Sequence, residues 1–260
     1  MLRNSTWTSG SSRKYRRADV GIFISYQSVL FSFPFFMMKT VPLPVAPRNA
    51  SPVSHLTSIH AVAPRGHYGN ARYPGNCGGY LIRDLLQYFK PKRVFDPMSG
   101  SGTCRDVCQE LGIEVVSADL HSGFDCSHPK NCDMVGEFDF VWIHPPYWRM
   151  KVYSNDPRDL SAARDLPEFL RKLSRVIVNC KHVLAPGGHL AILMGDYHDR
   201  EIGFVPLTYH TKRLCFNAGL IQDCTDIVRF QHGNSSSSKT YKSTFIPGLH
   251  DICLIVKQQK

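Results

Sequence analysis

The sequence contains few acidic residues and no CxxC pair of cysteines. Its 260 residues include 21 acidic side chains against 31 basic ones, which gives a formal net charge of +10. A moderate basic excess favours a polyanionic partner without identifying it. The nine cysteines are odd in number and scattered, with no CxxC pair, so no disulfide framework is indicated. We expect a reduced chain that uses cysteine as a small apolar residue.

One stretch has the composition of a metal site. "CSHPKNC" brings Cys126, His128 and Cys132 close together in the chain. Their spacing matches no common zinc pattern, and no second group of ligands accompanies them. A solvated loop is the simpler interpretation, and we predict no metal.

The N-terminal 38 residues differ in composition from the rest. Basic residues in "SSRKYRR" precede a charge-free run of 19 residues from Val20 to Met38. Such a run could anchor or export a protein, but polar residues and Pro34 interrupt it, and no small-residue cleavage site follows. We interpret residues 1–38 as a non-core extension and expect a cytoplasmic protein without stable membrane association. Residues 39–66, rich in proline and serine, are predicted to be a poorly ordered lead-in.

Strand and helix patterns alternate through residues 67–260, which we interpret as one domain. Apolar periodicity predicts helices at 80–89, 103–111, 165–184 and 208–219, and strands at 93–96, 114–119, 138–143, 189–195, 220–230 and 251–257. Asp165 and Glu168 form a capping box at the start of the longest helix, and "APGG" (185–188) ends it. Repeated βα units imply an α/β fold with a doubly wound, mostly parallel sheet, which binds ligands at the carboxyl ends of its strands.

A glycine-rich turn follows the first of these strands. "VFDPMSGSGTC" (94–104) places Asp96 at the strand end, and Gly100 and Gly102 let the backbone approach a ligand closely before a helix N-terminus. The next strand ends at Asp119, whose carboxylate could accept hydrogen bonds from ribose hydroxyls. Dinucleotide enzymes favour a third glycine where this chain has Arg105. The turn predicts a nucleoside cofactor and leaves open whether it is NAD or S-adenosylmethionine.

The central strand ends on a rigid corner, "FDFVWIHPPYW" (138–148). An exocyclic amine of adenine or cytosine is a poor nucleophile because its lone pair is delocalised into the ring. Hydrogen-bond acceptors that take the amine protons free that lone pair, and His144 and a carbonyl of Pro145-Pro146 could supply them. Tyr147 offers a face for stacking an extruded base. The corner therefore indicates methylation of a base amine by an already activated methyl donor.

The two motifs together resemble a known enzyme family. "DPMSGSGT" with "HPPYW" is similar to the S-adenosylmethionine-dependent DNA adenine-N6 and cytosine-N4 amino-methyltransferases, which carry D-P-F-x-G-S-G-T and [D/N/S]-P-P-[Y/F/W]. The upstream "HYGNARYPGNCGGYLIRDLL" (67–86) and the closing "HDICLIVK" (250–257) also look like segments of that family. The resemblance covers roughly residues 65–258 and implies a Rossmann-like class I methyltransferase fold.

The resemblance also implies roles for individual residues. S-adenosyl-L-methionine would be bound by Asp96, Pro97, Ser99, Gly100, Gly102, Asp119 and Asp125, with Asp119 at the ribose and Asp125 near the adenine. The target base would be held by His144, Pro145, Pro146 and Tyr147.

The chain departs from the family pattern at two positions. Met98 replaces the usual phenylalanine, which is a tolerable apolar exchange. His144 replaces the usual Asp, Asn or Ser, and it leaves the choice between adenine and cytosine open. A neutral imidazole accepts one hydrogen bond and a protonated one accepts none. Activity should therefore fall below about pH 6.5, the ordinary histidine pKa, unless the site shifts that pKa.

Basic and aromatic residues follow the corner and suit contact with nucleic acid. The candidates are Trp148, Arg149, Lys151 and Tyr153, together with Lys239 in the polar loop 231–248. Solvated loops explain both segments equally well. Neither segment is long enough to be a large recognition domain, so we expect a short or relaxed target sequence, or help from a restriction or recognition partner.

Our leading hypothesis is a site-specific methyltransferase that acts on a base flipped out of double-stranded DNA. An RNA amino-methyltransferase is the second hypothesis, since RNA enzymes share the Pro-Pro-Tyr corner, but no RNA-binding module is visible in the sequence. An NAD-dependent oxidoreductase and a non-catalytic nucleic-acid-binding module are more remote. The oligomeric state stays open.

Overall fold

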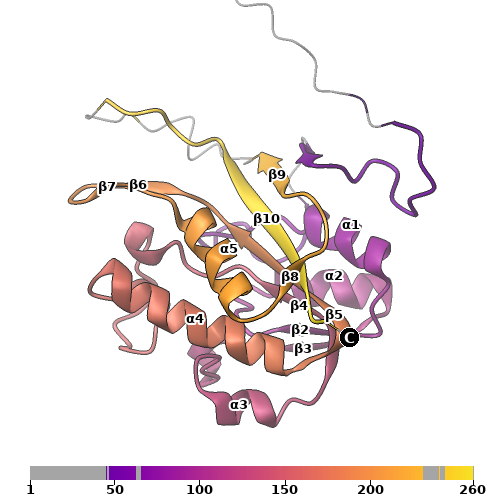
Figure 1. Cartoon of the computed structure of the whole chain (residues 1–260), viewed down its shortest axis with the longest axis horizontal. Helices are drawn as coiled ribbons and strands as arrows, with labels where there is room; N and C mark the ends of the chain where they lie inside the picture. The colour runs from indigo at the N-terminus through magenta and orange to yellow at the C-terminus, as the bar shows by residue number, and fades with distance from the viewer. Residues whose placement is uncertain (1–44, 46, 63–65, 231–239, 241–243, 260) are drawn as a thin grey trace, which may run out of the picture. The chain divides into compact units, whose positions relative to one another are not determined.

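The computed structural model describes residues 45, 47–62, 66–230, 240 and 244–259 (Figure 1). The predictions for residues 1–38 and for Lys239 lie outside this part of the chain. Within the described ranges, no helix combines the length and the apolar character needed to cross a membrane.

A central sheet of eight strands organises the described residues (Figure 1). Its strands are β1 (Ile59–His60), β2 (Arg93–Asp96), β3 (Glu114–Ser117), β4 (Phe138–Ile143), β5 (Leu184–Met194), β8 (Ile221–Gln222), β9 (Ile227–Phe230) and β10 (His250–Lys257). The order is β1-β9-β10-β5-β4-β2-β3, with β8 also paired to β10. Strand β10 runs antiparallel to β5, β8 and β9, and the other pairings are parallel. The predicted mostly parallel sheet is confirmed.

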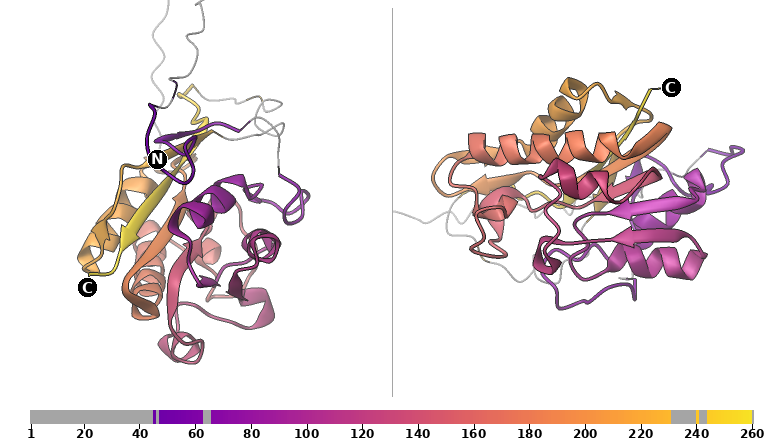
Figure 2. Two further views of the ribbon diagram at one scale, coloured as in Figure 1. Left: turned by 90° about the vertical axis from the view of Figure 1, so that its right-hand side faces the viewer. Right: turned by 90° about the horizontal axis from the view of Figure 1, so that it is seen from below.

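Helices cover both faces of this sheet (Figure 2). They are α1 (Tyr80–Phe89), α2 (Thr103–Leu111), α3 (Pro129–Asp133), α4 (Leu166–His182) and α5 (Leu207–Asn217). Buried side chains of α3, α4 and α5 belong to one hydrophobic cluster with one face of the sheet. Those of α1 and α2 form a second cluster with the opposite face. The double winding is therefore confirmed as well.

The sequence of the central strands explains why they are buried on both sides. In β4, Val141 and Ile143 pack into the cluster under α4, while Phe140 and Trp142 pack into the cluster under α1 and α2. Successive side chains of a strand point to opposite faces, so a strand covered twice must be apolar at nearly every position. This requirement places β4 in the middle of the sheet, with its carboxyl end at the centre of the edge where ligands bind.

Three predicted strands differ from the observed ones by more than one residue. Strand β3 ends at Ser117 rather than at residue 119. Strand β5 begins at Leu184 rather than at residue 189, because the backbones of Gly187 and Gly188 pair with Gln258 (N···O 3.1 and 3.0 Å). The predicted strand 220–230 is divided into β8 and β9. Between them the Gln222 amide bonds to the Cys224 carbonyl at 2.8 Å and to the Asp226 side chain at 2.9 Å, which closes a turn.

Two sets of short strands were missed in the sequence, as was α3 in the stretch interpreted as a solvated loop. Part of the lead-in predicted to be poorly ordered forms β1, which pairs in parallel with β9, and His60 of β1 bonds to the buried Asp84 carboxylate of α1 at 3.2 Å. The second is a hairpin of β6 (Tyr197–Asp199) and β7 (Gly203–Val205). Both consist of strands of two or three residues, too short for a period of two to be recognised.

The N-cap of α4 gives a test of the predicted capping box. The Asp165 carboxylate accepts a hydrogen bond from the Glu168 amide at 2.7 Å, as the capping box predicts. Replacing Asp165 with Ala should lower the free energy of unfolding by about 1 kcal/mol, because the first turn then has an amide without a partner. Urea denaturation measures this change. As a control, Asp133→Ala removes an exposed ion pair with His182 and should change stability by less than about 0.5 kcal/mol. Equal losses in both variants would contradict the capping role.

Candidate active site

The candidate site is a cavity of about 1330 Å³ at the carboxyl edge of the parallel strands. Strands β2, β3 and β4 end there. Asp96 is the last residue of β2, Asp119 follows the end of β3 by two residues, and His144 follows β4 directly; all three line the cavity. Every residue predicted for the cofactor and the base except Gly102 borders this one space, so the fold brings together two motifs that are more than 40 positions apart in the chain.

The glycine-rich turn lies as the sequence predicts, between β2 and α2. Gly100 and Gly102 have φ angles of +49° and +82°, in the left-handed region that glycine adopts without strain. The Gly100 amide donates to the Asp119 carboxylate at 2.9 Å, which fastens the turn to the end of β3. A Cβ on Gly100 would lie 2.9 Å from the Tyr73 ring, so a larger residue here would displace Tyr73 from the cavity wall.

Asp119 is held in position by several donors. One carboxylate oxygen accepts from Gly100, and the other accepts from the His121 amide at 2.9 Å and lies 3.0 Å from the ring nitrogen Nδ1 of His121. The side chain is 20% exposed toward the cavity. A carboxylate has about four acceptor positions, so one is still available to a hydroxyl group of a ligand.

The floor of this half of the cavity is acidic. Asp96 is only 2% exposed, and burial raises the pKa of its carboxyl group to about 8, although the Met98 amide bonds to it and opposes the shift. Asp119 and Asp125 line the same region. The nearby cation Arg105 is paired with Asp106 at 3.2 Å. A ligand that carries positive charge would fit this half better than one that carries phosphate groups.

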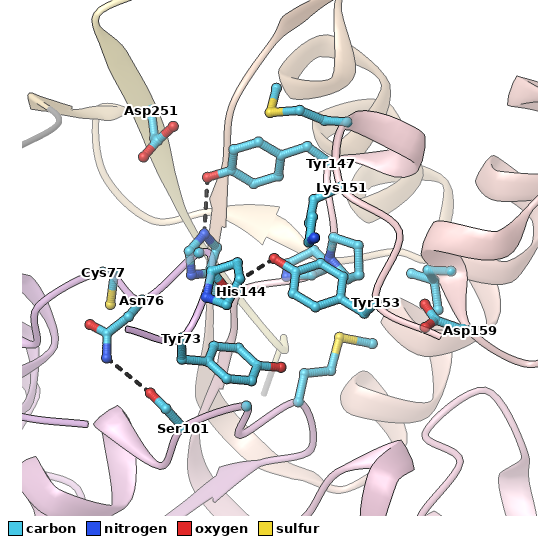
Figure 3. Close-up of a pocket in the computed structure, with 18 of the residues that line it drawn as sticks. Tyr73, Asn76, Cys77, Ser101, His144, Tyr147, Lys151, Tyr153, Asp159 and Asp251 are labelled. Carbon is cyan, nitrogen blue, oxygen red and sulfur yellow. Dashed lines mark hydrogen bonds between the residues drawn. The ribbon is translucent and has the colours of Figure 1, made fainter. Parts of the chain in front are cut away.

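Aromatic residues complete this half, and two of them, Phe124 and Tyr73, were not predicted as site residues. Phe124 lines the cavity and packs edge-on against Phe95, with ring centroids 5.8 Å apart. Tyr73 stacks with Tyr153 across the cavity, with centroids 6.0 Å apart and an angle of 21° between the rings (Figure 3). The Tyr153 hydroxyl donates to the Pro74 carbonyl at 3.2 Å. The pair connects the segment before α1 to the segment after the corner, and only the three-dimensional contact reveals it.

The corner after β4 holds His144 against the tyrosine three residues later. The ring nitrogen Nε2 of His144 lies 3.0 Å from the hydroxyl oxygen of Tyr147 (Figure 3). His144, Pro145, Pro146 and Tyr147 all line the cavity. Because the two prolines restrict the backbone between His144 and Tyr147, the two side chains are presented to the cavity in a defined arrangement.

Burial lowers the pKa of His144 to about 4, with Arg229 contributing in the same direction and Asp251 opposing it. The imidazole is therefore neutral across the physiological range. This corrects the expected fall in activity below about pH 6.5, because the site shifts the histidine well away from its ordinary pKa. An acceptor at this position remains available at mildly acidic pH.

Two residues of the far strands also reach this half of the cavity. Asp251 of β10 and Arg229 of β9 are buried, form an ion pair and line the cavity beside Tyr147. They are direct cross-strand partners in the antiparallel pairing. Neither was predicted as a site residue, although Asp251 lies in the closing segment "HDICLIVK" (250–257). The one available signal was a charged residue inside each of two otherwise apolar strands.

The structure corrects part of the predicted nucleic-acid contact. Trp148 is 1% exposed, has a φ of +47°, and donates its indole N–H to the Ala163 carbonyl at 2.9 Å, so it supports the corner from within the core. Arg149 is engaged by Asp199 and Glu201 at 2.8 and 2.7 Å and anchors the β6–β7 hairpin. Lys151 and Tyr153 do line the cavity.

The cysteine-rich stretch is built into the core. Cys126 and Cys132 are buried, with Cys126 lying 3.9 Å from Cys180, while His128 is exposed at the start of α3. Among the residues that the structure describes, no three His, Cys, Asp or Glu side chains are grouped to hold a metal ion. All nine cysteines are free, and seven are buried.

The chain resembles known proteins only at the level of structure. No family model matches the sequence, and no curated protein sequence matches it significantly. A candidate DNA modification methylase from Thermus thermophilus, solved with S-adenosyl-L-methionine, is 23% identical over 52% of this chain and 54% of its own, with a TM-score of 0.38. The chain thus matches about half the length of the Thermus protein.

Two further structures cover more of their own length. S-adenosylmethionine-dependent methyltransferases from Methanosarcina mazei and Archaeoglobus fulgidus are 12% and 15% identical to this chain. They match 64% and 68% of this chain and 92% and 93% of their own, each with a TM-score of 0.42. At these scores the likeness carries no argument about activity, which has to come from the site itself.

The low pKa of His144 can be tested by titration. Its ring signal in a histidine-labelled NMR sample should titrate near pH 4 rather than near pH 6.5. Because the folded-state pKa lies below the unfolded-state value, the unfolded chain takes up this proton first as the pH falls. His144 therefore lowers the free energy of unfolding progressively between about pH 6.5 and pH 4, and His144→Gln should remove that component.

Assignment of the signal requires a matched variant. His144→Gln should remove the signal with the low pKa, whereas His67→Gln, which removes an exposed ring, should leave it in place. A signal that disappears in His144→Gln but titrates near pH 6.5 in the wild type would show that the ring is accessible to water and not desolvated.

Proposed function

We propose that the protein is an S-adenosylmethionine-dependent methyltransferase with a class I fold, and that it methylates the exocyclic amine of adenine or cytosine in DNA. One observation carries the proposal. A single cavity has an acidic half, formed by the glycine-rich turn and Asp119, and a second half in which a neutral His144 lies on a Pro-Pro-Tyr corner. The first half suits a cationic nucleoside, and the second suits a planar base with an amine.

The residues of the acidic half fit this cofactor. When bound, S-adenosylmethionine supplies a methyl group on a positively charged sulfonium. The Asp119 carboxylate favours a positive ligand. A cation near Asp96 would stabilise the ionised form of that buried carboxyl group, which with a pKa of about 8 is mostly protonated at neutral pH in the free protein. The remaining acceptor position of Asp119 suits a ribose hydroxyl, and Phe124 offers an apolar face for a purine. A pyrophosphate would instead face these carboxylates, which disfavours NAD.

The residues of the corner fit activation of an amine. His144 accepts a hydrogen bond from one amine proton, and a carbonyl of the Pro145-Pro146 unit can accept from the other. These acceptors favour a pyramidal nitrogen with a localised lone pair. That lone pair would form the new N–C bond as the S–C bond of the methyl donor breaks, which would leave S-adenosylhomocysteine. With a pKa of about 4, His144 is too weak a base to abstract a proton from a neutral amine. The methylated nitrogen would be positively charged and therefore acidic, and it would then lose its surplus proton to solvent.

DNA is the proposed substrate because exposed cations border a deep base site. Arg72, Lys151 and Arg200 line the cavity and are exposed, and none makes an ion pair with the described residues. Such positions suit phosphate contacts on either side of a base turned out of the helix. The bordering segments are short, which supports a short target sequence or a partner that reads the sequence. We propose that the protein acts in the cytoplasm.

The function is tested by methyl transfer in vitro. The purified full chain is incubated with S-adenosylmethionine and unmethylated double-stranded DNA, and nucleosides are quantified by mass spectrometry. We expect N6-methyladenine or N4-methylcytosine. His144→Phe removes the acceptor and should lower the rate about 100-fold. Tyr147→Ala removes the stacking face and should lower it about 10- to 100-fold. His144→Asn, which restores an acceptor oxygen, should retain most of the activity.

The outcomes separate the candidate functions. A methylated base that appears only when RNA is supplied would move the substrate from DNA to RNA and leave the chemistry unchanged. No methylated base in either polymer, with S-adenosylmethionine bound, would indicate a non-catalytic module. Equal rates for His144→Phe and His144→Asn would exclude an acceptor role for His144.

Cofactor binding gives a separate prediction. Asp119→Ala should weaken binding of S-adenosylhomocysteine by about 10-fold or more, measured by calorimetry, because a charged acceptor and the anchor of Gly100 are both lost. Glu114→Ala is the matched control. It removes a carboxylate from the opposite end of β3, where Glu114 pairs with Arg93 at 2.6 Å, and should leave the affinity unchanged. Tight binding of NAD to the wild type, with no affinity for S-adenosylhomocysteine, would contradict the assignment of the cofactor.

A further inference from the structure

A chain of polar contacts runs from the cavity into the buried end of β10. His144 lies 3.0 Å from the Tyr147 hydroxyl through its nitrogen Nε2. The Tyr147 side chain lies beside Asp251, whose negative charge helps to raise the pKa of the phenol, and Asp251 forms a buried ion pair with Arg229. In Figure 3 the Tyr147 hydroxyl lies between the His144 ring and the Asp251 carboxylate. Arg229 also donates to the Cys77 carbonyl at 3.3 Å, which fastens the far end of the chain.

The backbone makes room for this arrangement. Asp251 is paired across the strands with Arg229, and the next residue of β10, Ile252, is paired with Met194 of β5. Gly195, which follows Met194, therefore lies beside Asp251. A Cβ on Gly195 would lie 2.6 Å from an Asp251 carboxylate oxygen and 2.7 Å from the Tyr147 ring. Only glycine lets Tyr147 and Asp251 approach each other here.

The position of each proton follows from the partners. Asp251, paired with Arg229, is a carboxylate and can only accept. Burial and Asp251 raise the pKa of Tyr147 well above its usual range, so the phenol keeps its single proton. That proton turns toward the carboxylate, because a buried negative charge attracts a nearby O–H strongly where the dielectric is low. The Tyr147 oxygen then needs a donor from His144, and a neutral imidazole has one N–H to give.

We propose that Asp251, acting through Tyr147, holds His144 in the tautomer with its proton on Nε2, so that Nδ1 is the acceptor for the amine of the target base. Asp251 and Arg229 are then positioning residues. Nδ1 has no hydrogen-bond partner among the described residues and is not among their buried unpaired atoms, and His144 lines the cavity. The use of Nδ1 by a base amine rests on the proposed function, but the tautomer itself does not.

The opposite tautomer would make the site unproductive. With the proton on Nδ1, His144 would present a donor to the cavity, and an amine proton would meet another N–H. The Tyr147 hydroxyl would meanwhile have to turn its proton toward His144 and its oxygen toward the Asp251 carboxylate, which is electrostatically unfavourable. The carboxylate therefore has the role of an orienting group for the imidazole, and loss of such a group typically costs catalytic rate rather than substrate affinity.

Long-range 1H–15N correlation spectra of 15N-histidine-labelled full-length protein test the proposal without any substrate. The two ring nitrogens give distinct signals in each neutral tautomer, and His144 is identified by its loss in His144→Gln. We expect wild-type His144 to be a single species protonated on Nε2. A wild-type spectrum with the proton on Nδ1 overturns the proposal, whatever the variants do.

Two variants break the chain at different links. Asp251→Asn frees the Tyr147 proton to turn toward His144, and Tyr147→Phe removes the partner of Nε2. Both should convert the single species to a mixture of tautomers. The control is Asp223→Asn, which removes a carboxylate that bonds to His189 at 3.1 Å and should leave His144 unchanged. If Asp251→Asn fails to fold, the spectrum of Tyr147→Phe by itself tests the proposal. An unchanged His144 spectrum in each variant that folds overturns the proposal.

Kinetics separate this inference from the proposed function. Asp251→Asn should lower kcat about 10-fold or more and leave the KM for S-adenosylmethionine within about 2-fold, because Asp251 does not border the acidic half. If wild-type protein transfers no methyl group to DNA or RNA, the proposed function fails while the spectra still report on the tautomer. If transfer occurs and Asp251→Asn retains the wild-type kcat, the positioning role fails and the function stands.

Discussion

The direction of β10 is the constraint on which the rest of the site depends. Parallel strands deliver their carboxyl ends to one edge of a sheet, so β2, β3, β4 and β5 bring their last residues together there. Strand β10 runs the other way between β5 and β9. It therefore brings its first residues to that edge, and Asp251 lies beside Tyr147 for this reason.

The two halves of the cavity differ in charge and in the groups that hold them in place. The acidic half is held by backbone amides, with Gly100 and His121 donating to Asp119. The other half is held by side chains, from His144 through Tyr147 to the ion pair on β9 and β10. A low dielectric strengthens such interactions and makes an unpaired partner costly, so the second half depends on every member being present. The same burial keeps His144 neutral.

Prediction from sequence was most successful where a pattern is local. Apolar periodicity identified α1, α2, β2 and β4 with their observed bounds, and Asp165 caps α4 as predicted. Prediction from sequence failed where contacts with distant parts of the chain decide the conformation of a segment or the burial of a side chain. Gly187 and Gly188 look like a helix stop but extend β5, because Gln258 supplies their hydrogen bonds. Trp148 looked like a ligand contact, yet its indole is buried and bonded to Ala163. Neither partner is near in sequence.

The sequence by itself determined the alternation of strands and helices, the glycine-rich turn, and the corner from His144 to Tyr147, because each depends on residues within a few positions of one another. Tertiary structure decided what those motifs do. It set the pKa of His144 through burial, and it engaged Arg149 in ion pairs with the β6–β7 hairpin. It also placed Asp251 and Arg229 behind Tyr147. Desolvation and long-range pairing depend on the packing of distant segments, which no local pattern in the chain encodes.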